Sequence, residues 1–325
     1  MLKSVLFFAI GLVLLIKGGD WFVDGATGIA KRFRLPDIVV GATVVSIGTT
    51  LPEVMVSTTG ALAGSGAMAY GNAIGSIICN TALIAAISIT VNPGPVNVKS
   101  MKTPVIFFFG SAALYCVASY VLGEFPRWLG FVMLSVFLCY TILTVRNGLK
   151  NPDQGSYEEE EEESKEKPLW MELLLLVVGA AVIAVGADLL VDHGQIIARE
   201  LGVPETVVAL LFVALGTSLP ELVTTLTSLK KGRASLGVGN VIGANVFNLV
   251  LVSGVAVSLA PFEVPCQNFL LNTGLNMSLV LEIPVMLGVM SLMTIPALLT
   301  KKLHRWQGVA LLCMYAAFCV CQFVL

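Results

Sequence analysis

Long apolar stretches separated by short polar ones run through almost the whole chain. A helix needs about 20 mainly apolar residues to cross a bilayer, and ten stretches of this chain meet that requirement. They cover residues 3–24, 37–61, 68–90, 104–122, 127–146, 169–191, 205–229, 236–259, 278–299 and 306–324. The pattern predicts an all-α integral membrane protein with ten transmembrane helices.

One long hydrophilic stretch interrupts this pattern between the fifth and the sixth span. It reads NPDQGSYEEEEEESKEKP, and a block of like charges with Pro, Gly and Ser cannot bury a core. We therefore expect a first unit over residues 1–147, an acidic linker over 148–168 and a second unit over 169–325. No small-residue cleavage site follows the first apolar stretch, so we expect it to be retained as a membrane span.

The two units repeat each other without a gap. IGTTLPE at 47–53 matches LGTSLPE at 215–221, and GNAIGSIICN at 71–80 matches GNVIGANVFN at 239–248. The offset, 168 residues from Glu53 to Glu221, also pairs Asp20 with Asp188 and Asp24 with Asp192. Each unit is therefore predicted to be one five-helix module.

An odd number of spans per unit makes the second unit cross the membrane in the opposite sense. The Lys and Arg residues test this, because they concentrate in cytoplasmic loops. With the amino terminus outside, 15 of the 19 lie in cytoplasmic loops and three, Lys3, Arg127 and Arg199, in external ones. We therefore expect both termini outside and the acidic loop in the cytoplasm. Inverted repeats of this kind are typical of secondary transporters, whose site lies where the repeats meet.

The composition supports a membrane protein and excludes one class of partner. Hydrophobic residues make up 56% of the chain and charged residues 12%, against about 25% charged in soluble domains. The net charge of −2 leaves no basic excess for nucleic acid, so the expected partners are membrane lipid and inorganic cations. The seven cysteines show no metal-site spacing and are predicted to be packing residues.

Glu53 and Glu221 are the residues that indicate a functional site. Each lies inside an apolar span, where a charged residue costs about 2.5–3.5 kcal/mol at the helix centre. No Lys or Arg lies near either glutamate in its span, so we expect the counter-charge to be a cation from solution. Oxygen ligands suit hard cations such as Ca²⁺. The two histidines, His193 and His304, lie outside the motifs, which argues against a zinc or copper site.

The Gly and Pro residues of each motif predict a span broken at mid-depth. Pro52 and Pro220 lack a backbone donor and free a carbonyl one turn earlier. Proline suits the first turn of a helix, which places the following glutamate at that turn. We expect free carbonyls from the unwound turns, at Ser46 and Ala214, to face the site.

The paired G-T-[TS]-L-P-E and G-N-x-I-G-x-x-x-x-N motifs resemble the two alpha-repeats of the cation/calcium exchanger superfamily, in particular the compact sodium/calcium exchangers of prokaryotes. The resemblance covers roughly residues 1–90 and 169–260. It implies a plasma-membrane antiporter, without a cofactor, that exchanges cytoplasmic Ca²⁺ for external Na⁺ by alternating access. It further implies that the long first and sixth spans move against the rest.

Carried over by position, the resemblance also implies the ligands. Ca²⁺ would be held by Glu53 and Glu221 with carbonyls from Ser46 and Ala214. The residues implied for the adjoining Na⁺ sites are Thr49, Thr50, Ser76, Asn80, Thr217, Ser218 and Asn248.

Two departures from the family pattern leave the coupling ion open. Many sodium/calcium exchangers have an aspartate where this chain has Asn248, and a serine where it has Ala244. Two glutamates carry a charge of −2, which one Ca²⁺ neutralises, whereas three Na⁺ would leave +1 in a low dielectric. The related proton-coupled calcium exchangers also pair two glutamates with two asparagines, so Ca²⁺/H⁺ exchange is the alternative.

Two further classes are weaker. A cation channel usually builds its pore from several subunits, whereas one chain with an internal inverted repeat favours a carrier and is compatible with a monomer. An enzyme is disfavoured because HExxH and GxSxG motifs are absent from the sequence.

Other polar residues in or near the spans receive structural interpretations. Asn72 and Asn240 are predicted to join helices by hydrogen bonds. The paired aspartates at 20, 24, 188 and 192 are expected to be solvated at the interface, with cation recruitment along two access paths as the alternative. Glu282 has no repeat partner and is assigned no role.

Overall fold

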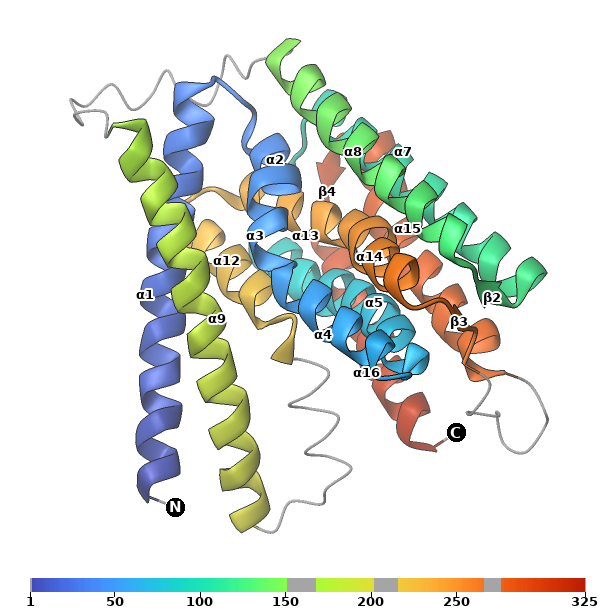
Figure 1. The fold of residues 1–325 in the computed structure, drawn as a ribbon. Coiled ribbons are helices and arrows are strands. Elements are labelled where there is room, and N and C mark those ends of the chain that lie inside the picture. The colour runs from blue at the N-terminus through green and yellow to red at the C-terminus, as the bar shows by residue number, and fades with distance from the viewer. Residues whose placement is uncertain (1, 151–167, 202–215, 266–275, 325) are drawn as a thin grey trace.

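The computed structural model describes residues 2–150, 168–201, 216–265 and 276–324. Within these ranges, seven helical stretches are long and apolar enough to cross a membrane, and an eighth counts if the bent helix over residues 37–62 is one span. The chain folds into a bundle of long helices (Figure 1). The all-α membrane architecture predicted from the sequence is confirmed and agrees with a ten-helix inverted repeat.

The first unit contains the predicted spans one to five. Their elements are α1 (Leu2–Arg32); α2 (Asp37–Val40), the π-helical turn η1 (Gly41–Val45), α3 (Ser46–Thr49) and α4 (Leu51–Leu62); α5 (Gly66–Cys79), η2 (Asn80–Ala85) and α6 (Ala86–Val91); α7 (Val98–Cys116) and η3 (Val117–Leu122); and α8 (Arg127–Lys150). The fourth span begins at Val98 and not near residue 104, because the Asn97 side chain accepts hydrogen bonds from the N–H groups of Lys99 and Ser100 at 3.1 and 3.3 Å.

The second unit repeats this order. Its described elements are α9 (Leu169–Glu200); α12 (Leu219–Lys230); α13 (Ala234–Phe247), η5 (Asn248–Val252) and α14 (Ser253–Leu259); η7 (Ser278–Glu282) and α15 (Ile283–Thr300); and α16 (Arg305–Val324). Most of the acidic linker, residues 151–167, and the first half of the seventh predicted span lie outside the described residues.

The two spans that carry the second motif of each repeat form the centre of the bundle. The spans over Gly66–Val91 and Ala234–Leu259 are the most deeply buried of those described. Their π-helical turns begin at equivalent residues, Asn80 and Asn248. Such turns widen a helix locally and are frequent at functional sites. The duplication therefore places the same irregularity twice at the centre of the protein.

Two short antiparallel sheets join the repeats. In one, β1 (Gly94–Pro95) pairs with β4 (Lys302–Leu303); in the other, β2 (Glu124–Phe125) pairs with β3 (Phe262–Glu263). Paired strands must lie on the same side of the membrane. The Lys and Arg distribution assigns the loops of β1 and β4 to one side and those of β2 and β3 to the other. The pairing therefore agrees with the predicted division of the loops between the two sides.

α1 and α9 lie side by side at one edge of the bundle (Figure 1). A Cβ atom on Gly11 would lie 2.8 Å from the carbonyl oxygen of Gly186, so only glycine permits this approach. Near the end of α1, the Arg32 Nε atom lies 3.0 Å from a carboxylate oxygen of the buried Glu172 on α9. Both helices continue past the predicted ends, residues 24 and 191, to Arg32 and Glu200.

Candidate cation-binding site

The break in the first motif lies at Thr50. The helical stretch Asp37–Thr49 and α4 meet there at an angle of 45°, and Pro52 and Glu53 occupy the first turn of α4. Thr50 has φ −86° and ψ −1°, and its repeat equivalent Ser218 has φ −88° and ψ 5°. The broken span predicted from proline is confirmed for the first motif. Because α12 begins with the same turn, Glu221 takes the equivalent position in the second motif.

One expectation for the backbone is wrong. The sequence led us to expect a free carbonyl at Ser46, but the Thr50 N–H donates to that oxygen at 3.0 Å. Proline deprives the residue four positions earlier of its donor, so the carbonyl that Pro52 releases is that of Gly48. Ala214, the other predicted carbonyl ligand, lies outside the described residues.

The two glutamate side chains are buried at the same place. Both are 0% exposed, and among the described residues neither carboxylate has a hydrogen-bond partner. The two carboxylates lie close enough to interact electrostatically, and the hydroxyl groups of Thr49 and Thr50 lie near the Glu221 carboxylate. Two carboxylates from different repeats therefore share one enclosed region, and no Lys or Arg of the described ranges pairs with either of them.

Further polar atoms in this region also lack partners among the described residues. They are Thr50 Oγ1, Ser218 Oγ, both side-chain polar atoms of Asn80 and the Asn248 Oδ1 atom. The Asn248 amide donates to the Ala244 carbonyl at 3.0 Å, which leaves its oxygen unpaired. A buried polar group without a partner costs about 1–3 kcal/mol, and such groups are rare unless a ligand or water satisfies them. Carboxylate, hydroxyl and amide oxygens fit a hard cation as the substrate.

The remaining predicted site residues lie nearby. Ser76 is buried on α5, one turn before Asn80. Thr217 is half-buried in the turn before α12. No group of three or more His, Cys, Asp or Glu residues converges as a metal site in the part of the chain that the structure describes. A cation here would therefore have two carboxylates, and its other ligands would be neutral oxygens.

Two asparagines connect the repeats to each other. Thr49 Oγ1 donates to Asn240 Oδ1 at 3.2 Å, and the equivalent Thr217 Oγ1 donates to Asn72 Oδ1 at 3.3 Å. Asn72 also donates to Ser57 Oγ at 2.8 Å. The prediction that Asn72 and Asn240 join helices is thus confirmed. What sequence reasoning missed is that their partners are predicted site residues of the opposite repeat.

The Ser46 and Asn245 side chains also gain contacts that the motifs did not indicate. Ser46 Oγ donates to the Asn240 carbonyl at 2.9 Å, across the repeat boundary. Asn245 is fully buried and donates to Thr81 Oγ1 at 2.7 Å, while its oxygen lacks a partner among the described residues. The repeat equivalent of Asn245 is the apolar Ile77, so the duplication carried no signal for this position.

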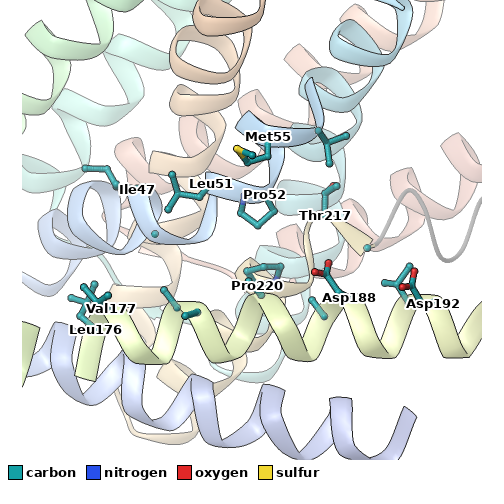
Figure 2. A pocket seen from close by; sticks show the side chains of 18 of the residues that line it. Ile47, Leu51, Pro52, Met55, Leu176, Val177, Asp188, Asp192, Thr217 and Pro220 are labelled. Carbon is teal, nitrogen blue, oxygen red and sulfur yellow. The ribbon is translucent and has the colours of Figure 1, made fainter. Parts of the chain in front are cut away.

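A cavity of about 890 Å³ lies between α9 and the broken motif helices. Figure 2 shows Asp188 and Asp192 of α9 at one end, with Thr217 and Pro220 close to them and Pro52 across the cavity. Because Pro220 directly precedes Glu221 in the first turn of α12, the cavity extends from two aspartates to the turn that carries one buried glutamate.

The sequence as a whole is similar to membrane exchangers. Residues 3–146 and 171–324 match the sequence pattern of the sodium/calcium exchanger protein family. An uncharacterized membrane protein of Methanocaldococcus jannaschii is 33% identical over 318 residues, which are 97% of this chain and 96% of that protein. The sodium/calcium exchanger MaX1 of Methanosarcina acetivorans is 29% identical, over 98% of each chain.

The fold is also similar to solved structures. The sodium-calcium exchanger NCX_Mj, soaked with Na⁺ and Sr²⁺, superposes with a TM-score of 0.77 at 31% sequence identity, over 97% of both chains. This similarity covers both halves of the chain, including the spans outside the motifs. It therefore extends the resemblance beyond the two motifs on which the sequence analysis depended.

Proposed function

This chain belongs to the sodium/calcium exchanger family, and on that premise we propose that it extrudes cytoplasmic Ca²⁺ in exchange for external Na⁺. It is a multi-pass membrane protein that exchanges cations, and the choice of Na⁺ as the counter-ion is the proposal. The observation that carries it is the pair of buried carboxylates, Glu53 and Glu221, which have no hydrogen-bonding or cationic partner in the part of the chain that the structure describes.

We assign Ca²⁺ to the two glutamates. One Ca²⁺ balances their two charges, which a low dielectric requires. The Na⁺ ions would use the same carboxylates with the neighbouring oxygens of Thr49, Thr50, Ser76, Asn80, Thr217, Ser218 and Asn248. Because both ions need the same two charges, they compete, and competition for one site makes the protein an exchanger and not a symporter.

Alternating access would come from the pair α1 and α9 moving against the remaining helices. The pair is tightly packed within itself at Gly11 and Gly186 and joined by Arg32 and Glu172. In contrast, the cavity separates α9 from the motif helices on one side. A unit that is rigid internally and borders a cavity on one of its sides can move as one body.

We further propose the orientation that the basic residues indicate. Both termini would be external, and the units over residues 1–147 and 169–325 would be joined by a cytoplasmic acidic linker over 148–168. The two antiparallel sheets, each with one strand from each unit, support the division of loops that this orientation requires. The protein would work as a single chain in lipid.

The experiment is Ca²⁺ flux in reconstituted vesicles. Purified protein in liposomes is given radioactive Ca²⁺ outside, under an outward Na⁺ gradient with pH balanced, and then under an outward H⁺ gradient with Na⁺ balanced. We expect uptake with the Na⁺ gradient and not with the H⁺ gradient. Uptake driven only by H⁺ would overturn the assignment of Na⁺ and leave a calcium/proton exchanger.

A further inference from the structure

α1 and α9 each carry a pair of aspartates one turn apart, at equivalent positions of the repeat. A spacing of four residues puts the members of each pair on one face of the helix. Asp20 and Asp24 lie on α1, and Asp188 and Asp192 on α9. The two pairs lie toward opposite ends of the antiparallel helices, so they mark the two directions from which a cation could approach the centre.

A lysine side chain of the protein binds the aspartate pair on α1. Lys231, directly after α12, places its Nζ atom 2.7 Å from Asp24 Oδ1, 2.9 Å from the Asp20 carbonyl oxygen and 3.7 Å from Asp20 Oδ1. Subtracting the repeat offset of 168 residues from position 231 gives Ala63, which has no charge. The duplication therefore reproduced the aspartates but not the lysine.

The pair on α9 lies in a different environment. Asp188 and Asp192 line the cavity beside Thr217 (Figure 2). Val191, between them in sequence, also lines this cavity and is half-buried. The repeat equivalent of Val191 is Val23 on α1, which is 0% exposed.

The packing of α1 and α9 against their neighbours shows the same difference. A Cβ atom on Gly19 of α1 would lie 2.7 Å from the Val223 side chain and 2.9 Å from Thr227 Oγ1, both on α12. Ala187, the repeat equivalent of Gly19, instead lines the cavity, as does Met55 of α4. The helix pair is therefore seated against α12 on the α1 side and held away from α4 on the α9 side.

We propose that Lys231 is a latch that biases the protein toward this conformation. By binding Asp20 and Asp24, its ammonium group holds α1 on α12 and keeps the cavity beside Asp188 and Asp192 open. The latch rests on the proposed function, because it needs α1 and α9 to move together. It makes the two conformations of the transport cycle unequal in free energy, although the repeats that carry the site are equivalent.

Two other ion pairs at this end of the bundle do not join the α1–α9 pair to a neighbouring helix. Arg32 and Glu172 join α1 to α9, within the pair that moves. Arg233 and Asp37, 3.3 Å apart, join the start of α13 to α2, outside that pair. Lys231 connects α1 to α12, from the moving pair to a neighbouring motif helix. Its contact is thus broken when α1 leaves α12.

The contact is strong enough to bias the equilibrium between the two conformations but weak enough to break during each transport cycle. The Asp24 side chain is 47% exposed and that of Lys231 28%, and water screens such a pair. An exposed ion pair of this kind shifts a two-state equilibrium by about two- to fivefold. The latch should therefore favour one conformation without locking it, as a transport cycle requires.

The test uses two reporter thiols and does not depend on transport. In a protein whose native cysteines are replaced, Val191→Cys reports on the open side and Val23→Cys on the closed side. Their modification rates by a water-soluble maleimide are measured in detergent. With Lys231→Gln we expect the rate at position 191 to fall and the rate at position 23 to rise, each by about two- to fivefold.

The matched control is Lys230→Gln, which removes the same charge from an exposed neighbour in the sequence. It should change neither rate. Combining Lys231→Asp with Asp24→Lys should restore both rates, and about 1 M salt should reduce the difference between Lys231 and Lys231→Gln. Equal rates for Lys231→Gln and Lys230→Gln would overturn the latch, whatever the vesicles transport. A shift in the rates without Na⁺-driven Ca²⁺ uptake would support the latch and overturn the proposed function.

Discussion

The hydroxyl group of Thr49 donates a hydrogen bond to the side-chain oxygen of Asn240, 3.2 Å away in the other repeat. The same bond forms in reverse between Thr217 and Asn72, at 3.3 Å. Each residue before the break of one motif is therefore held by the second motif of the opposite repeat. The two halves of the site cannot shift independently, because each one positions the other.

We expect this pair of bonds to contribute equally to stability. Thr49→Val removes one of the two hydroxyl groups that donate to Asn240 Oδ1, because Ser46 Oγ also lies 3.3 Å from that oxygen. It should lower the free energy of unfolding by about 0.5–1.5 kcal/mol, with a similar loss for Thr217→Val. Thermal unfolding in detergent measures both. Combining Thr49→Val with Asn240→Leu should cost less than the sum of the single changes, and additive losses would show that the contact does not couple the repeats.

The two buried glutamates should both be required for Ca²⁺ transport. Glu53→Gln and Glu221→Gln remove one of two charges that would balance Ca²⁺, so we expect Na⁺-driven Ca²⁺ uptake to fall to the level of empty vesicles. Glu282→Gln is the matched control, since Glu282 is half-buried and bonded to Gln322. It should retain most of the uptake. Uptake near the unchanged protein's rate in either site variant would refute the ligand assignment.

The charge of the site predicts how transport responds to voltage. Two carboxylates balance two Na⁺ as well as one Ca²⁺, so we expect uptake in the unchanged protein to be insensitive to a K⁺ diffusion potential imposed with valinomycin. Asn248→Asp adds a third negative charge in a low dielectric and should make the rate depend on that potential and more steeply on Na⁺. Strong voltage dependence without the substitution would show that more positive charge moves than two carboxylates can balance.

The close approach of α1 and α9 predicts that alanine destabilises the protein at position 11 but not at position 110. Gly11→Ala puts a methyl group 2.8 Å from the Gly186 carbonyl oxygen, and overpacking of this kind typically costs about 1–3 kcal/mol. Gly110→Ala in α7 is the control, because nothing lies within 4 Å of its added Cβ atom. That change should stabilise the helix by up to about 1 kcal/mol. Both are read from unfolding temperatures in detergent, and equal effects would contradict the tight pairing.

The sequence by itself determined the membrane class, the approximate positions of the spans that the structure describes, the duplication and the two buried glutamates. These follow from local rules. A long apolar stretch indicates a span, proline indicates a break in the helix, and an ionisable residue in a span indicates a functional site. Every one of these features repeats at a constant offset, so two copies support each inference. The break at Thr50 and the position of Glu53 in the next turn follow from the order of residues in IGTTLPE alone.

Only the tertiary structure decided which groups of different repeats meet. It showed that the Ser46 carbonyl accepts from Thr50, that Asn240 binds Thr49, and that Lys231 lies between Asp20 and Asp24. The sequence lists Asp20 and Asp188 as equivalents, yet one lies beside a lysine and the other lines a cavity. A repeat makes two halves alike, but a transporter occupies one conformation at a time. The packing of α1 and α9 in that conformation makes equivalent residues different.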